Sequence, residues 1–134
     1  MRNALSLYTD GGARGNPGPG AIGIVIVKGN RIVVEYKEKI GRSTNNQAEY
    51  KALIKGLELA AAYAREVRCF LDSQLTVRQV TGKYKVKNKT LQELFSQLKE
   101  REKHFKKIMY THLRRTHPLI QKADQLVNEA LDEK

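Results

Sequence analysis

The chain alternates short apolar stretches, rich in β-branched residues, with longer stretches in which apolar residues recur at every third or fourth position. The first pattern is typical of β-strands and the second of amphipathic helices. Strands are predicted at Asn3–Thr9, Ala21–Lys28, Arg31–Ile40, Val67–Leu71 and Lys107–Leu113. Helices are predicted at Gln47–Ala64, Ser73–Thr81, Thr90–Phe105 and Pro118–Leu131. Strands that alternate with helices in this way predict an α/β fold with a mixed sheet.

The connecting segments add direction and limits to these elements. Gly29 and Asn30 between two β-branched runs are a short hairpin signal, so those two strands are expected to be antiparallel. Gly11–Gly20, rich in Gly, Asn and Pro, is predicted to be a loop. Asn46, followed three residues later by Glu49, resembles a capping box. Because the sequence contains no internal repeat and no linker, residues 1–134 are expected to form one domain.

Charge adds a class of partner to this fold. The chain has 25 Lys and Arg against 14 Asp and Glu, which gives a formal net charge of +11. Such an excess favours a polyanion such as nucleic acid, although a basic protein without that role stays an alternative. The single cysteine, Cys69, excludes an internal disulfide and indicates a reducing compartment. Since no stretch resembles a membrane span or a signal segment, we expect a cytoplasmic protein that binds no membrane. We also expect the protein to be a monomer.

Four acidic residues stand out by their positions. Asp10 and Asp72 each follow a predicted strand. If those strands are parallel neighbours, both carboxylates emerge at the edge of the sheet where ligands of open α/β folds bind. Glu49 lies at one end of the apolar stripe of its helix and points toward the sheet. Asp124 lies inside the last predicted helix, so the four acids could converge from four separate elements.

Each of these acids also has a purely structural interpretation, as a turn residue, a helix cap or a surface acid. Those interpretations do not explain why acids follow two strands in a strongly basic protein. Clustered carboxylates repel one another and need a hard divalent cation. Mg²⁺ fits because it prefers oxygen ligands and keeps bound waters that can react. Zinc is not expected, because the cysteine and the three histidines show no ligand spacing.

The residues around the four acids resemble the type 1 ribonuclease H family, and the resemblance covers nearly the whole chain. Two motifs are highly specific: TDGGARGNPGPGA at Thr9–Ala21 and TNNQAEY at Thr44–Tyr50. LDSQ at Leu71–Gln74 and ADQL at Ala123–Leu126 are short, and their order and spacing support them. The resemblance implies a ribonuclease H-like fold, which is a five-stranded mixed sheet flanked by helices.

The resemblance also implies an activity, endonucleolytic hydrolysis of the RNA strand of an RNA–DNA hybrid that leaves 5′-phosphate and 3′-hydroxyl ends. Asp10, Glu49, Asp72 and Asp124 would be the catalytic residues and would hold two Mg²⁺ ions, with Asp10 bridging them and Mn²⁺ as a possible substitute. One ion would activate water for in-line attack, and the other would stabilise the leaving oxygen. Activity on double-stranded RNA stays open.

Selection of RNA over DNA depends on the 2′-hydroxyl group, which only RNA carries. By resemblance, the backbone near Gly11 and Gly12 and several amide side chains read this group. These amides are Asn16, Asn45, Asn46 and Gln74. Arg42, Thr44 and Asn88 match family positions that grip a phosphate of the DNA strand. Turn and cap roles for Asn45 and Asn46, and a purely local loop role for Asn88, stay open as alternatives.

The chain departs from the family pattern before its third long helix. Many relatives insert a basic, Trp-containing protrusion there, whereas this chain has the compact segment Gly82–Thr90 and no Trp. We therefore expect hybrid binding to rest on dispersed Lys and Arg, with a lower affinity or a different orientation. The dispersed cations of this segment are Lys83, Lys85, Lys87 and Lys89.

A second departure lies before Asp124. Compact relatives can carry a basic residue seven positions ahead of the last Asp, where this chain has His117. His117 is therefore a candidate catalytic residue that moves a proton to the leaving group or helps release product. Arg114, at a position where many relatives have a mobile His, and the adjacent Arg115 are alternatives for this role. Ile120 stands where relatives often have Asn, which leaves the shape of this loop open.

Two other functions remain open at the level of sequence. A non-catalytic module could bind hybrid or double-stranded RNA by shape, but such a module gains nothing from four carboxylates beside phosphates. A structure-selective DNA nuclease could share the general fold, but the Asn-rich second motif argues against it.

Overall fold

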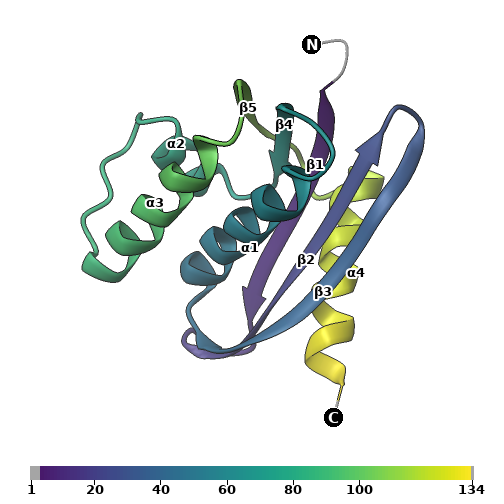
Figure 1. Ribbon diagram of the computed structural model, residues 1–134. Coiled ribbons are helices and arrows are strands. Elements are labelled where there is room, and N and C mark those ends of the chain that lie inside the picture. Colours follow the sequence, from purple (N-terminus) through teal and green to yellow (C-terminus); the bar gives the residue numbers. More distant parts are fainter. Residues whose placement is uncertain (1–3, 134) are drawn as a thin grey trace.

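The structure is a computed structural model that describes residues 4–133. Within these residues the elements follow the predicted order (Figure 1). The strands are β1 (Leu5–Ala13), β2 (Gly18–Lys28), β3 (Arg31–Ser43), β4 (Glu66–Leu71) and β5 (Lys107–His112). The helices are α1 (Asn45–Ala60), α2 (Gln74–Val80), α3 (Lys89–Glu102) and α4 (Pro118–Asp132).

The five strands of the described chain form one mixed sheet in the order β3-β2-β1-β4-β5. β1, β2 and β3 form an antiparallel meander, which confirms the predicted hairpin at Gly29 and Asn30. β1 pairs in parallel with β4, and β4 pairs in parallel with β5. The predicted five-stranded mixed sheet is therefore confirmed.

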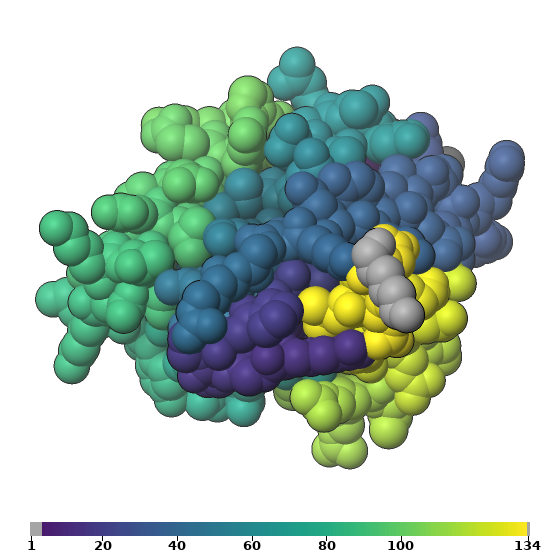
Figure 2. All heavy atoms as spheres, turned by 90° about the horizontal axis from the view of Figure 1, so that it is seen from below, coloured from purple at the N-terminus to yellow at the C-terminus, as the bar shows by residue number. Residues whose placement is uncertain are grey.

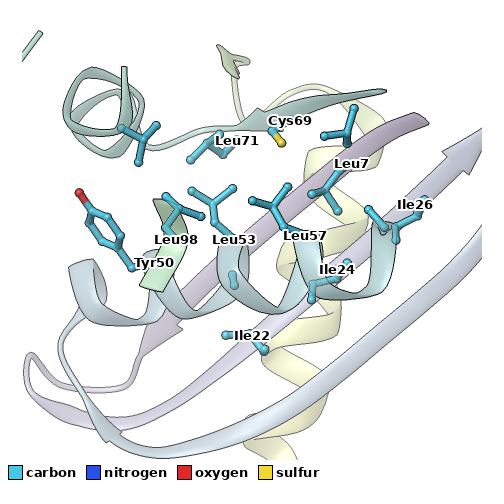
Figure 3. Packing of buried hydrophobic residues seen from close by; sticks show 14 of the residues in the cluster. Leu7, Ile22, Ile24, Ile26, Tyr50, Leu53, Leu57, Cys69, Leu71 and Leu98 are labelled. Atoms are coloured by element: carbon cyan, nitrogen blue, oxygen red, sulfur yellow. The ribbon is translucent and has the colours of Figure 1, made fainter. Parts of the chain in front are cut away.

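Helices cover both faces of the sheet, and α4 lies on the opposite side from α1 (Figure 1). The larger core packs α1 and α3 against apolar side chains of β1, β2 and β4. Figure 3 shows Ile22, Ile24 and Ile26 of β2 directed toward Leu53 and Leu57 of α1. The smaller core on the other face packs α4 onto β1 and β2. Because β1 is covered on both faces, its apolar residues do not alternate with polar ones, as the sequence predicted.

β1 does not end at Asp10, which corrects the predicted boundary of the first strand and of the loop after it. Asp10 pairs with Gly23, and the antiparallel ladder with β2 continues until Ala13 pairs with Gly20. Glycine has a low propensity for strands, but the backbone hydrogen bonds to β2 hold this stretch in a strand. Pairing with a neighbouring strand thus overrides the local preference. The predicted loop shrinks to a turn between Ala13 and Gly18. Asn3, the predicted first residue of the strand, lies outside the described residues.

The start of α1 also differs from the prediction. The N-cap is Thr44, whose Oγ1 accepts a hydrogen bond from the Gln47 backbone, while the Gln47 side chain accepts one from the Thr44 backbone. Asn46 and Glu49 therefore do not form the predicted capping box. At its other end α1 stops at Ala60, earlier than the predicted Ala64. The prediction was too long because this alanine-rich stretch contains no Gly or Pro that would mark the end of the helix.

The parallel pairing of β1 with β4 is the feature that positions the site. It places Asp10 of β1 and Asp72, directly after β4, at the same edge of the sheet, as the sequence predicted. α1 begins at this edge and α4 crosses the opposite face, so residues from both helices can reach it. Among the described residues, no helix combines the length and apolarity that a bilayer span requires.

Candidate active site

Three of the predicted carboxylates meet at the edge of the sheet. Each of Asp10, Glu49 and Asp72 offers an oxygen atom, and these atoms all lie within 4.8 Å of one another. Asp124 of α4 joins them in lining one cavity of about 580 Å³. The structure thus brings together all four acids, from β1, α1, the end of β4 and α4, as predicted.

Glu49 is held in place by a close contact between α1 and β1. Its side chain is 6% exposed, and its Oε1 accepts a hydrogen bond of 3.0 Å from the backbone N–H of Gly11. A Cβ atom at Gly11 would lie 2.2 Å from the Ala48 carbonyl oxygen, so only glycine allows this approach. Glu49 Oε2 is buried and has no hydrogen-bond partner among the described residues.

Burial and mutual repulsion make Asp10 and Glu49 hard to ionise. Burial raises the pKa of Asp10 from 3.8 to about 7, and the negative charges of Asp72 and Asp124 add to the shift. Burial also raises the pKa of Glu49 well above its usual range, with the charge of Asp10 as the next cause. A divalent cation would remove both causes, since it replaces lost hydration and neutralises the repulsion.

Asp72 has a cationic neighbour and does not cap α2. The N-cap of α2 is Ser73, whose hydroxyl accepts a hydrogen bond of 3.2 Å from the Thr76 backbone. Arg115, from the segment between β5 and α4, instead donates from Nε to Asp72 Oδ2 at 3.0 Å. The structural alternative of a helix cap is thus excluded for Asp72, as it is for Glu49.

The β1–β2 turn and the start of α1 are joined by the predicted amide residues. Asn45 Oδ1 accepts a hydrogen bond of 3.0 Å from the Ala13 backbone, and Asn16 Oδ1 accepts one of 2.9 Å from the Asn45 backbone. Gly11, Gly12, Asn45 and Asn46 all line the carboxylate cavity. These contacts fix the backbone of the turn beside the acids.

The remaining predicted substrate residues lie farther out. Gln74 is exposed at the first position of α2, next to Ser73, which lines the cavity. Thr44 caps α1, and Arg42 lines a neighbouring cavity of about 360 Å³ between β2, β3 and α4. Asn88 caps α3, where its Oδ1 accepts a hydrogen bond of 3.0 Å from the Leu91 backbone. Asn88 thus has a structural role as a helix cap, which was not predicted from the sequence, and its phosphate contact stays a prediction.

His117 has a structural position. It is the N-cap of α4, and its Nδ1 accepts a hydrogen bond of 3.2 Å from the Leu119 backbone. Its ring stacks on Tyr8 with 5.5 Å between the ring centroids. Among the described residues, those lining the carboxylate cavity include Arg114 and Arg115 and do not include His117. A catalytic role for His117 stays a prediction.

The cavity also contains residues that sequence reasoning did not select. His112 ends β5, whose last pair with β4 is Leu71 and His112, so the rule that parallel strand ends meet would have found it. Arg14 and Asn128 meet across the cavity at 3.4 Å, from the β1–β2 turn and from α4. Their proximity depends on the docking of α4, for which the sequence near either residue contains no signal.

Known proteins are similar to this chain in sequence and in fold. A family model described as "Reverse transcriptase-like" matches residues 8–130. Ribonuclease HI of Halobacterium salinarum is 43% identical over 128 residues, which are 94% of this chain and 63% of that protein. A bifunctional protein of Mycobacterium tuberculosis is 40% identical over 94% of this chain and 35% of its own length. The chain thus spans between one third and two thirds of the length of these relatives.

Solved structures match over their full length. Ribonuclease H1 of Halobacterium salinarum, known from a crystal structure, is 41% identical and superposes with a TM-score of 0.92. The match covers 98% of this chain and 99% of that chain. LC11 ribonuclease H1, solved in complex with an RNA/DNA hybrid, is 42% identical with a TM-score of 0.87 and 96% coverage of both chains. The chain therefore belongs to the type 1 ribonuclease H family, in the compact form that lacks a basic protrusion before α3.

Proposed function

We propose that this protein is an endonuclease that hydrolyses the RNA strand of RNA–DNA hybrids and leaves 5′-phosphate and 3′-hydroxyl ends. The observation that carries the proposal is the convergence of four carboxylates on one cavity of a protein with a net charge of +11. A basic surface attracts the substrate, and a local group of acids that can bind cations supplies the site of reaction.

We propose that this donor set holds two divalent metal ions, Mg²⁺ with Mn²⁺ as a substitute. The oxygens of Asp10, Glu49 and Asp72 lie within 4.8 Å of one another, and Glu49 Oε2 is buried without a hydrogen-bond partner among the described residues. Hard oxygen donors of this kind suit Mg²⁺. When bound, the two ions supply water activation and stabilisation of the leaving oxygen. Asp124 would complete the set. Burial raises the pKa of Asp10 and the charges of Asp72 and Asp124 raise it further, and Asp10 would be the ligand that both ions share.

The chain's own residues orient this donor set. The Gly11 backbone N–H holds Oε1 of Glu49, which leaves Oε2 free for a cation. Arg115 Nε holds Oδ2 of Asp72 in the same way. Fixed carboxylates lose little entropy when a cation binds, so the site is prepared for the reaction.

The proposed substrate is a hybrid, in line with the RNA/DNA hybrid bound to LC11 ribonuclease H1. The end of β1 at Gly12 and Ala13, held by Asn45, would let a sugar–phosphate backbone approach and would read the 2′-hydroxyl group with backbone and amide groups. Arg42 and Thr44 would contact a phosphate of the DNA strand. Double-stranded RNA also carries 2′-hydroxyl groups and is the second substrate to test. We propose that the enzyme acts as a monomer in the cytoplasm.

A cleavage assay tests the proposal on labelled hybrid, double-stranded RNA, double-stranded DNA and a duplex with one ribonucleotide, each with Mg²⁺ and with Mn²⁺. We expect hybrid cleavage that is lost in Asp10→Asn and Asp72→Asn while the fold is kept. Glu129→Gln, which changes a partly exposed acid of α4 that is not among the described residues lining the carboxylate cavity, is the matched control and should cleave normally. Hybrid cleavage at the wild-type rate in both Asp variants, or tight binding without turnover in either metal, would overturn the proposal.

His117→Ala belongs in the same assay because its structural position competes with the predicted catalytic role. A fall in kcat at an unchanged melting temperature would support proton transfer by His117. A fall in melting temperature at an unchanged kcat would assign it to the cap of α4 alone.

A further inference from the structure

Arg14 extends from the β1–β2 turn across the cavity to α4. Its Nη1 lies 2.7 Å from Asp132 Oδ1, and its Nη2 donates to Asn128 Oδ1 at 3.4 Å. Figure 2 shows the N-terminal part of the chain, in purple, lying against the yellow α4 on this face. Asn128 and Asp132 follow Asp124 on α4 by one and two turns, which is about 6 and 12 Å along the helix. The guanidinium is thus beside the carboxylate site and outside its metal-binding acids.

The backbone of Arg14 is fixed, while its side chain is free to exchange partners. The Arg14 N–H donates to the Pro19 carbonyl at 2.9 Å, and a Cβ at Gly18 would lie 2.0 Å from the Arg14 carbonyl oxygen. The side chains of Arg14 and Asp132 are 49% and 66% exposed. Exposed ion pairs of this kind are weak, whereas a guanidinium binds phosphate through two parallel, charge-assisted hydrogen bonds. A phosphate that reached Arg14 would therefore displace Asp132.

We propose that Arg14 binds a backbone phosphate of the hybrid and that Asp132 occupies its guanidinium until the substrate arrives. The inference rests on the proposed function, because it assigns a phosphate subsite to the same cavity. At about 3.4 Å of axis per phosphate, the span from Asp124 to Asp132 corresponds to roughly two to four phosphates of one strand. Arg14 thus raises the affinity for hybrid through a phosphate roughly two to four positions from the scissile bond. Asp132 lowers that affinity because it competes with the phosphate for the guanidinium.

Lys37 provides a matched control for Arg14. It also pairs with acids at the C-terminal end of α4, at 3.9 Å to Glu129 and at 2.9 Å to Glu133, the residue that caps the helix, with similar exposure. Among the described residues, however, those lining the carboxylate cavity include Arg14 and not Lys37. Removal of either cation breaks an exposed pair with the same helix, and only removal of Arg14 should weaken the binding of hybrid.

The test measures binding of a fluorescent hybrid by anisotropy in EDTA over a series of salt concentrations, with kinetics in Mg²⁺. We expect Arg14→Ala to weaken binding about tenfold, to lower the salt slope by about one and to raise KM at a nearly unchanged kcat. Asp132→Asn should tighten binding about two- to fivefold, since it removes the competing charge. Lys37→Ala and Glu133→Gln should match wild type. Arg14→Lys should keep the salt slope and lose part of the affinity.

Each result has a definite meaning. If wild type binds and cleaves hybrid but Arg14→Ala behaves as Lys37→Ala does, the phosphate subsite is wrong and the proposed function stands. If Asp132→Asn binds no more tightly than Glu133→Gln, the competition is wrong. If wild type neither binds nor cleaves hybrid, the proposed function fails and the inference fails with it. Because Asp132→Asn is expected to gain affinity, loss of folding cannot imitate its effect.

Discussion

Glu49 is a carboxylate that the fold buries beside two others, at the point where α1 contacts β1. Such a group is unfavourable unless hydrogen bonds and a cation compensate for its lost hydration. One compensating hydrogen bond comes from the Gly11 backbone, and it forms because a residue without Cβ lets the Ala48 carbonyl approach. The position of the acid therefore depends on its glycine neighbour as much as on the acid itself.

We expect Gly11→Ala to destabilise the protein by about 1–3 kcal/mol and to abolish hybrid cleavage. The added Cβ would lie 2.2 Å from the Ala48 carbonyl oxygen, so α1 must move away from β1 and carry Glu49 with it. Urea unfolding measures the change in free energy. Gly12→Ala is the control, because its Cβ would meet nothing closer than Val127 Cγ1 at 3.8 Å. Equal stabilities of the two variants would contradict this account.

At the scale of elements, α1 shows what a sequence pattern leaves ambiguous. Thr44 with Gln47 and Asn46 with Glu49 both match the spacing of a capping box, and the sequence alone does not choose between them. The structure uses the first pair, which frees Glu49 to point into the site. The end of β1 was ambiguous for a related reason, because glycine-rich residues become strand only through pairing with β2.

Thr44→Ala should destabilise the protein by about 1 kcal/mol, since it removes the side-chain acceptor at the N-cap of α1. Asn46→Ala should change the free energy of unfolding by only a few tenths of a kcal/mol, because Asn46 lies inside the helix. The two substituted residues lie two positions apart, so the pair of variants tells whether Thr44 with Gln47 or Asn46 with Glu49 caps the helix. A larger loss for Asn46→Ala than for Thr44→Ala in urea unfolding would restore the assignment made from sequence.

At the scale of the whole molecule, the order of strands and helices and the meeting of the four acids could be predicted from sequence. Each acid lies next to an element whose apolar period is strong, and the rule for parallel strand ends then joins Asp10 to Asp72. The contacts of Arg14 with Asn128 and of Arg115 with Asp72 could not be predicted. They connect turns to distant elements, and local periodicity contains no information on such contacts.

The segment between α2 and α3 should supply much of the salt-dependent affinity for hybrid. Three lysines, Lys83, Lys85 and Lys87, lie in this segment, a fourth, Lys89, opens α3, and the stretch from Gly82 to Thr90 contains no acidic residue. If these contact phosphates, replacing all four with Ala should lower the slope of log K against log salt by up to about three. Lys55→Ala with Lys103→Ala is the control, since both lysines have acidic partners. A slope equal to that of wild type would show that the hybrid binds elsewhere.

The acids of the site should make the metal-free protein less stable as pH rises. Asp10 has a pKa of 3.8 when unperturbed and about 7 in the fold, so between these values the folded state binds more protons than the unfolded state. Stability must then fall with rising pH across this window, by at most about 1.4 kcal/mol per pH unit for one group.

Urea unfolding in EDTA between pH 4 and pH 8 would measure this fall, and the difference between wild type and Asp10→Asn isolates the contribution of Asp10 from that of other titrating groups. We expect the Asn variant to be the more stable protein near pH 7.5, because it removes a buried charge that nothing neutralises. Saturating Mg²⁺ should reverse the order, since the ion stabilises the folded state only where the carboxylate can bind it. The opposite result would be a rise in the stability of wild type, relative to Asp10→Asn, from pH 4 to pH 7 in EDTA. That result would mean that a cation of the protein itself, such as the guanidinium of Arg115, already neutralises the site.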